Sequence, residues 1–199
     1  MFPTGSRRVK VLKLLGIGLV VATALFIGVG FVLPNRWEVK RKVTIQAPTA
    51  IVHKRIATLR GWPEWAAWTE KTDPAATWEW GGVDGQLGSF MAWKGPKMGT
   101  GRLTLTESLP ERVVFDGAIE SDVVNARSTF TLTAVKDGSV DAVEVEWRDE
   151  GTTPPIVGGY MKSLIEDTLG KHFEAGLVGL KRVAEAEAPA VPVASRGTP

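Results

Sequence analysis

Residues 156–184 read IVGGYMKSLIEDTLGKHFEAGLVGLKRVA. Apolar side chains recur in this stretch at steps of three and four residues, which places them in one stripe along an α-helix. A helix of this length extends for about 40 Å, so it could cross a whole β-sheet. The stripe consists of Ile156, Tyr160, Met161, Leu164, Ile165, Leu169, Phe173, Leu177, Leu180 and Val183.

Glycines interrupt this predicted helix, although each costs up to about 1 kcal/mol relative to alanine in a helix interior. Two explanations are open. The glycines could permit close packing against a sheet, or they could leave room for a bound molecule and allow the helix to bend. They are Gly158, Gly159, Gly170, Gly176 and Gly179.

The sheet that this helix would cover precedes it in the chain. Alternation of apolar and polar residues predicts strands at 37–46, 77–80, 88–93, 101–109, 112–119, 126–135 and 140–149. Asp137-Gly138, between the last two, is typical of a hairpin turn. Strands that follow one another this closely pair antiparallel, and a sheet with one apolar face needs a cover. The predicted fold class is therefore α+β, with a seven-stranded antiparallel sheet wrapped around a long C-terminal helix.

The first two predicted strands are joined by a helical connection. Ala47-Pro48-Thr49 begins a short helix, and Gly61-Trp62-Pro63 ends it. A second short turn can follow over residues 63–68. The region thus contains a strand, two short helices, six strands and a long helix, in that order.

The N-terminal part of the chain is of a different kind. Residues 14–33 read LLGIGLVVATALFIGVGFVL, which contains no charge and spans about 30 Å as a helix, the thickness of a bilayer core. The run exceeds the apolar region of a typical signal peptide, which favours an uncleaved anchor. The basic tail at residues 1–13 is expected to stay cytoplasmic, although basic residues flank both ends. The body is then expected on the periplasmic or cell-exterior side of a single-pass protein.

Charge and composition exclude several functions. The formal net charge is +2, but residues 1–35 carry four basic residues and no acid, so the remainder is slightly acidic. Such a body lacks the basic surface that nucleic-acid binding requires. The chain has no cysteine, which excludes disulfides, thiolate metal sites and a cysteine nucleophile. No metal site and no cofactor are predicted. The low-complexity residues 185–199 are expected to be a disordered tail.

Several segments carry a resemblance to a known superfamily. They are VTIQAPTAIVH at 43–53, IATLRGWPEWAAW at 56–68, GTGRLTLTESLPERV at 99–113 and VEVEW at 143–147. Together with the element order, they resemble the SRPBCC (START-like) superfamily, and most of all its bacterial polyketide cyclase/dehydrase and lipid transport proteins. The resemblance covers residues 37–184. It implies a helix-grip fold with a deep, largely apolar cavity between the sheet and the long helix.

The inward-facing and aromatic residues are the candidates to line that cavity. Glu107 shares the parity of Leu103 and Leu105, so a buried carboxylate there could act as an acid or base or bind a polar ligand group. Alternatively, Glu107 lies at a strand end or is paired by an arginine. The candidate lining residues are Trp65, Trp68, Trp78, Trp80, Trp93, Leu105, Glu107, Phe115, Phe130, Trp147, Tyr160, Leu164 and Leu169.

Three functions remain open at this point. The first is a membrane-anchored carrier or sensor that binds a lipid or another hydrophobic small molecule. The second is an enzyme of the polyketide cyclase/dehydrase type. It is less favoured because no catalytic constellation is visible, and because His53 and His172 are expected to be surface or packed histidines. The third is a non-catalytic protein-interaction module, which a cavity filled by the protein's own side chains would favour.

Overall fold

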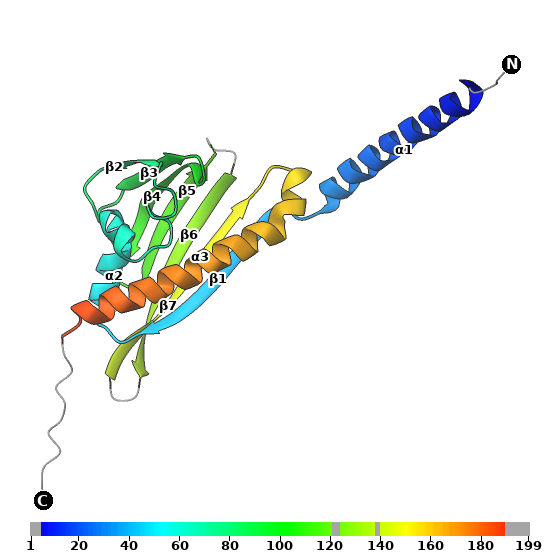
Figure 1. Ribbon diagram of the computed structural model, residues 1–199. Coiled ribbons are helices and arrows are strands. Elements are labelled where there is room, and N and C mark those ends of the chain that lie inside the picture. Colours follow the sequence, from blue (N-terminus) through cyan, green and yellow to red (C-terminus); the bar gives the residue numbers. More distant parts are fainter. Residues whose placement is uncertain (1–4, 121–123, 138–139, 190–199) are drawn as a thin grey trace, which may run out of the picture.

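The computed structural model describes residues 5–120, 124–137 and 140–189 (Figure 1). One antiparallel sheet of seven strands has the order β1-β7-β6-β5-β4-β3-β2. The strands are β1 (Arg36–Ile45), β2 (Thr77–Gly81), β3 (Phe90–Gly95), β4 (Gly99–Leu109), β5 (Arg112–Ile119), β6 (Val124–Asp137) and β7 (Val140–Thr152). Asp137 pairs with Val140 across the last hairpin, whose turn lies outside the described residues.

The helices are α1 (Gly5–Val32), α2 (Thr49–Ala57), the 3₁₀ helix η1 (Leu59–Glu64) and α3 (Val157–Glu187). Figure 1 shows α3 lying lengthwise across one face of the sheet, whereas α1 projects away from it. This arrangement confirms the predicted helix-grip fold with an apolar N-terminal helix.

The C-terminal end of α3 lies beyond its predicted end at Ala184. Glu185 accepts a hydrogen bond from the Gln46 N–H at 2.8 Å, and Glu187 pairs with Arg55 at 2.7 Å. These contacts tie the last turn to β1 and α2, so residues 185–187 are helical and not part of a tail. Residues 190–199, the rest of the predicted tail, lie outside the described residues.

Two helix glycines show that close packing explains part of the glycine pattern. A Cβ at Gly179 would overlap the backbone carbonyl oxygen of Trp65, and a Cβ at Gly176 would lie 3.1 Å from the Trp147 ring. Both positions are where α3 contacts the core. A Cβ at Gly170 would meet only the end of the Arg41 side chain, which can move aside.

Gly179→Ala is expected to lower the free energy of unfolding by about 1–3 kcal/mol, because a methyl group would push α3 away from the backbone of Trp65. The matched control is Gly170→Ala, which gains helix propensity and is expected to raise stability by up to about 1 kcal/mol. Urea unfolding of the full chain in detergent, followed by tryptophan fluorescence, measures both. Equal effects of the two substitutions would contradict this explanation.

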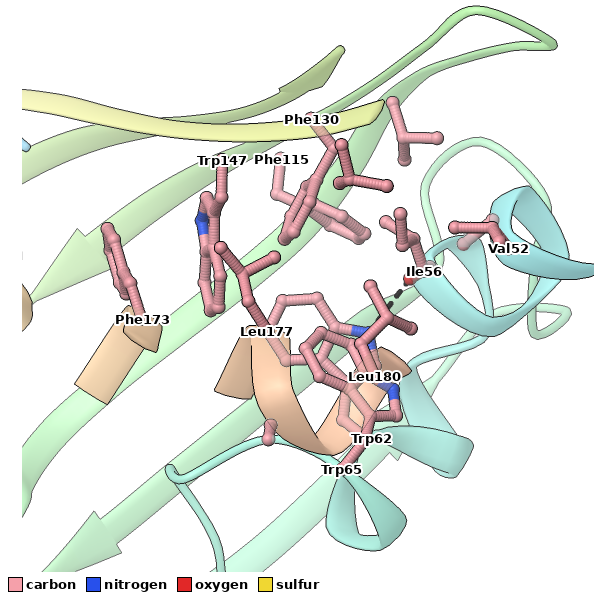
Figure 2. Packing of buried hydrophobic residues seen from close by; sticks show 14 of the residues in the cluster. Val52, Ile56, Trp62, Trp65, Phe115, Phe130, Trp147, Phe173, Leu177 and Leu180 are labelled. Atoms are coloured by element: carbon pink, nitrogen blue, oxygen red, sulfur yellow. Dashed lines mark hydrogen bonds between the residues drawn. The ribbon is translucent and has the colours of Figure 1, made fainter. Parts of the chain in front are cut away.

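The core contains a cluster of aromatic rings held between the sheet, η1 and α3, together with aliphatic side chains (Figure 2). Trp147 stacks between Phe130, at 4.7 Å between ring centroids, and Phe173 of α3, at 4.0 Å. Trp62 contacts Phe115 edge-on at 5.3 Å. Most of the space that the helix grip encloses is therefore filled by the protein's own side chains.

The end of α1 contacts the beginning of α3. Tyr160 stacks on Phe26 at 4.6 Å between ring centroids, and its hydroxyl donates to the Phe26 carbonyl at 2.8 Å. Gly30 has no side chain, which allows Ile156 to pack against the backbone of α1. A Cβ at Gly30 would lie only 2.8 Å from Ile156. The first turns of α3 thus lie beside α1.

Candidate functional site

A cavity remains between the sheet and the middle of α3. Its inner end is formed by buried rings, among them Trp93, Trp147 and Phe173, while half-buried residues such as Leu103 and Leu169 surround its opening. The cavity measures about 90 Å³, whereas ligand pockets for drug-sized molecules measure roughly 300–1,000 Å³. Its lining residues are Trp62, Ala66, Ala67, Trp68, Trp93, Leu103, Ile119, Ser128, Trp147, Asp149, Leu169, His172 and Phe173.

Only some of the predicted lining residues lie at this cavity: Trp68, Trp93, Trp147 and Leu169. Their role in ligand binding stays a prediction. Trp65, Leu105, Phe115 and Phe130 point inward as predicted, but they are packed in the core and leave no space beside them.

Four further predicted residues lie elsewhere. Trp78 and Trp80 stack on each other at 6.0 Å on the edge strand β2, and Trp78 borders a separate, open hollow along β2, β3 and β4. Tyr160 is 41% exposed and Leu164 is 63% exposed on the first turns of α3. Placing Tyr160 and Leu164 in the cavity was wrong, because α3 begins beside α1 and reaches the cavity only at Leu169.

The inward direction predicted for Glu107 was also wrong. A β-bulge between Leu105 and Glu107 inserts Thr106, so Leu105 pairs with Phe115 while Glu107 pairs with Val114. One extra residue reverses the parity of the strand. Glu107 consequently lies on the outer face, where its carboxylate is 3.5 Å from Arg112, the alternative that its sequence position had left open.

The inward carboxyl group belongs to Asp149 instead. Asp149 lies on β7 between Val39 of β1 and Ser128 of β6, and it lines the cavity. Its Oδ1 is shielded from solvent and has no hydrogen-bond partner in the described part of the chain. Burial raises the pKa of Asp149 to about 8, which a hydrogen bond from the Glu150 N–H offsets only in part. Asp149 is therefore predominantly a neutral acid at pH 7.

Two more polar side chains line the same cavity. Ser128 is buried, and its hydroxyl accepts a hydrogen bond from the Trp147 Nε1–H at 2.7 Å. Nδ1 of His172, on α3, is 2.8 Å from the carbonyl oxygen of Thr168. The His172 ring packs edge-on against Trp68, with 5.5 Å between the ring centroids. Because a carbonyl oxygen can only accept, Nδ1 of His172 is the donor of this hydrogen bond. The cavity thus combines apolar walls with a few polar groups.

Asp149, Ser128 and His172 are the polar lining residues that the sequence interpretation did not place at the cavity. A signal for Asp149 existed, because it has the same parity as Val143, Val145 and Trp147. His172 follows Leu169 by three residues, which places both on one side of α3. In the described residues, no three His, Asp or Glu side chains gather closely enough to hold a metal ion.

Comparison with known proteins gives the fold and the family. The chain is similar to protein CV1439 from Chromobacterium violaceum (17% identity, 76% of this chain and 99% of that one, TM-score 0.52). It is also similar to norcoclaurine synthase from Thalictrum flavum (15% identity, 81% and 93%, TM-score 0.53). A third similar structure is the di-domain ARO/CYC StfQ of the steffimycin biosynthetic pathway (10% identity, 76% and 51%, TM-score 0.58).

At these identities the solved structures show a common fold and no common activity. No curated protein matches the chain. The model of one family, described as polyketide cyclase/dehydrase and lipid transport, matches residues 36–185, which include the whole sheet and nearly all of α3. The chain therefore belongs to the polyketide cyclase/dehydrase and lipid transport family.

Proposed function

We propose that this protein is a membrane-anchored domain that binds a hydrophobic small molecule or lipid between its sheet and α3, as a carrier or a sensor. The observation that supports this most is the partly open cavity at Leu103, Leu169 and Phe173. Concave sites with apolar and aromatic walls and a few polar groups are typical of small-molecule binding. The family and the fold of the solved structures support a ligand-binding domain as well.

The anchor would be α1. Lys10–Val32 is long and apolar enough to cross a membrane, and a signal sequence would meet the same criterion. The surface next to α1 supports an anchor, because the first turns of α3 expose Val157, Tyr160, Met161 and Leu164. This apolar surface would lie against the bilayer, with the body on the periplasmic or cell-exterior side. The cavity would then open within reach of membrane lipids, which raises their effective concentration.

The small volume limits what the closed cavity can hold. About 90 Å³ corresponds to roughly three water molecules, so only one end of a longer molecule would fit. The rest would extend past the half-buried opening, or α3 would move outward to admit it. The same small volume favours the alternative function, a protein-interaction module that binds no ligand in its cavity.

Blocking the cavity tests the two functions. Leu103→Trp and Ala67→Phe would each place an aromatic ring at the opening of the cavity. We expect either substitution to lower the amount of co-purifying small molecule at least about tenfold. The reason is that burying an apolar group of side-chain size contributes about 1.5–3 kcal/mol to binding, and the blocked cavity would lose this contribution. Leu87→Trp is the matched control, because Leu87 is 66% exposed and away from the cavity. The measurement is mass spectrometry of extracts from the full chain purified out of its native membrane.

Near-UV circular dichroism of each variant would establish that it is folded. An empty wild-type protein, which also takes up no lipid from added vesicles, would contradict ligand binding and favour the interaction module. Equal occupancy in the wild type and in both blocked variants would place the bound molecule outside the cavity.

A further inference from the structure

The connection between α1 and the body is short and is held by hydrogen bonds. Only Leu33, Pro34 and Asn35 lie between α1 and β1. The Asn35 carbonyl accepts hydrogen bonds from the Thr153 N–H at 2.9 Å and from the Thr153 hydroxyl at 3.1 Å. The Asn35 side-chain amide donates in turn to the Thr153 carbonyl at 3.1 Å. Since Thr153 lies just before α3, these bonds join the end of α1 to the beginning of α3.

Packing between the two helices fixes their relative height. Gly30 of α1 lies against Ile156, and a Cβ at Gly159 would overlap the side chain of Leu33. In both helices the two contact positions are three residues apart, so the first turn of α3 runs beside the last turn of α1. The apolar span Lys10–Val32 ends at this same level. The beginning of α3 therefore lies level with the end of the segment that would cross the membrane.

The first turns of α3 have an exposed apolar face. Its side chains follow the steps of three and four residues that place them on one side of a helix, and their exposed fractions range from 41% to 63%. Apolar side chains that gather in this way on a surface mark a site of contact with a membrane or with another protein. The face consists of Val157, Tyr160, Met161 and Leu164.

The polar side chains of the same turns are paired within the protein. The Tyr160 hydroxyl donates to the Phe26 carbonyl at 2.8 Å. Lys162 and Glu166 form an ion pair, and Glu166 also accepts a hydrogen bond from the Glu38 N–H of β1 at 3.2 Å. A hydroxyl or a charge without a partner is costly outside water, whereas paired groups are tolerated. This pairing suits an environment that is less polar than water.

We propose that the first turns of α3 and the last turn of α1 form one rigid unit, which inserts into the membrane interface and holds the body in a single orientation on the bilayer. The bilayer would cover the apolar face, because this face begins at the level where the apolar span ends. Leu169, at the cavity, is about 20 Å along α3 from Ile156, so the unit would also fix the distance from the bilayer to the opening. The inference rests on the proposed function, since it requires α1 to cross the membrane. It goes further, because a flexible tether would anchor the body equally well.

Single-cysteine variants of the full chain test the insertion, because the chain has no cysteine of its own. Met161→Cys places a polarity-sensitive NBD label on the apolar face, and Val178→Cys places it at an exposed position farther along α3. Leu19→Cys, inside the apolar span, reports whether α1 crosses the membrane. Each protein is reconstituted into nanodiscs of phosphatidylcholine and phosphatidylglycerol, with or without lipids that carry nitroxides along the acyl chain. We expect these lipids to quench most of the fluorescence at positions 19 and 161, and little of it at position 178.

Substitution of a glycine tests whether the two helices act as one unit. Gly30→Leu would push Ile156 away from α1, so we expect it to reduce the quenching at position 161 toward the level at position 178. Gly28→Leu is the matched control, because it changes the same helix and a Cβ there would meet nothing within 4 Å. This control is expected to leave the quenching at position 161 unchanged. Near-UV circular dichroism of each variant would establish that the body is folded.

The possible failures are distinguishable. If the label at position 19 is not quenched, α1 does not cross the membrane, and the proposed anchor fails together with this inference. If position 19 is quenched while position 161 behaves like position 178, the anchor stands and the insertion of α3 is wrong. A label at position 161 that neither nitroxide lipids nor aqueous iodide can quench would place another protein copy on this face, which also overturns the proposal. Equal quenching in Gly30→Leu and Gly28→Leu would show that the helices do not act as one unit.

Discussion

Replacing Trp62 with alanine is expected to lower the free energy of unfolding by about 3–5 kcal/mol, the usual cost of deleting a large buried aromatic side chain. Trp62 is 2% exposed and contacts Trp65, Phe130 and Trp147 with ring centroids 5.0–6.1 Å away (Figure 2). Its Nε1–H also donates to the Ile56 carbonyl at 2.8 Å, which joins η1 to α2. Alanine would leave a cavity between these elements and an unpaired carbonyl.

Two controls separate the contributions of Trp62. Trp62→Phe keeps most of the ring and loses the donor, so it is expected to cost less than the alanine variant. Leu87→Ala, at an exposed position, is expected to change stability by less than about 0.5 kcal/mol. Urea unfolding of the full chain in detergent, followed by near-UV circular dichroism, measures all three. A cost below 1 kcal/mol for Trp62→Ala would contradict the packing described for the core.

The second large effect is the pH dependence that Asp149 gives to stability. The pKa of Asp149 is raised by burial to about 8 in the folded state, from 3.8 in an ordinary aspartate. Below pH 4 both states bind the proton, so the stabilising effect of a neutral Asp149 is fully present. Between pH 4 and pH 8 the unfolded state loses the proton and the folded state keeps it, so stability falls as pH rises.

We expect the free energy of unfolding to fall by about 1.4 kcal/mol for each pH unit between pH 4 and pH 8. The free energy of unfolding at pH 7 would then be about 4 kcal/mol lower than at pH 4. Asp149→Asn cannot titrate, so the stability difference between this variant and the wild type is expected to shift in favour of Asn by that amount from pH 4 to pH 7. The comparison uses the difference in free energy of unfolding between the variant and the wild type at each pH. The contributions of the other titrating groups are the same in both proteins and therefore cancel, and the cost of burying the amide does not change with pH.

Asp141→Asn is the matched control for this experiment. Asp141 is on the same strand, but its side chain is 84% exposed and pairs with Lys136 at the surface. The stability difference between this variant and the wild type is expected to stay constant across the same pH range, because the substitution replaces an exposed side chain and changes no buried group. If Asp149→Asn were to give the same flat profile, Asp149 would be ionised in the folded protein.

The sequence determined which elements form and in which order they follow one another along the chain. Alternation places successive side chains on opposite faces of a strand, and steps of three and four place them on one side of a helix. These local periods were sufficient to predict the seven strands and the covering helix, and an unbroken apolar run was sufficient to predict the N-terminal helix. They also sufficed for the inward direction of Leu105, Phe115, Phe130 and Trp147.

The tertiary structure decided which inward residues meet empty space. Phe115 and Phe130 face Trp62 and are packed, whereas Trp147 borders both the core and the cavity. The bulge at Thr106 turned Glu107 outward, and the position of α1 took Tyr160 away from the cavity. The physical reason is that local periodicity fixes the face on which a side chain lies, while register shifts and opposing side chains depend on contacts between residues far apart in the chain. The neutral state of Asp149 follows from its burial among such contacts, because the same residue in an open strand would be charged.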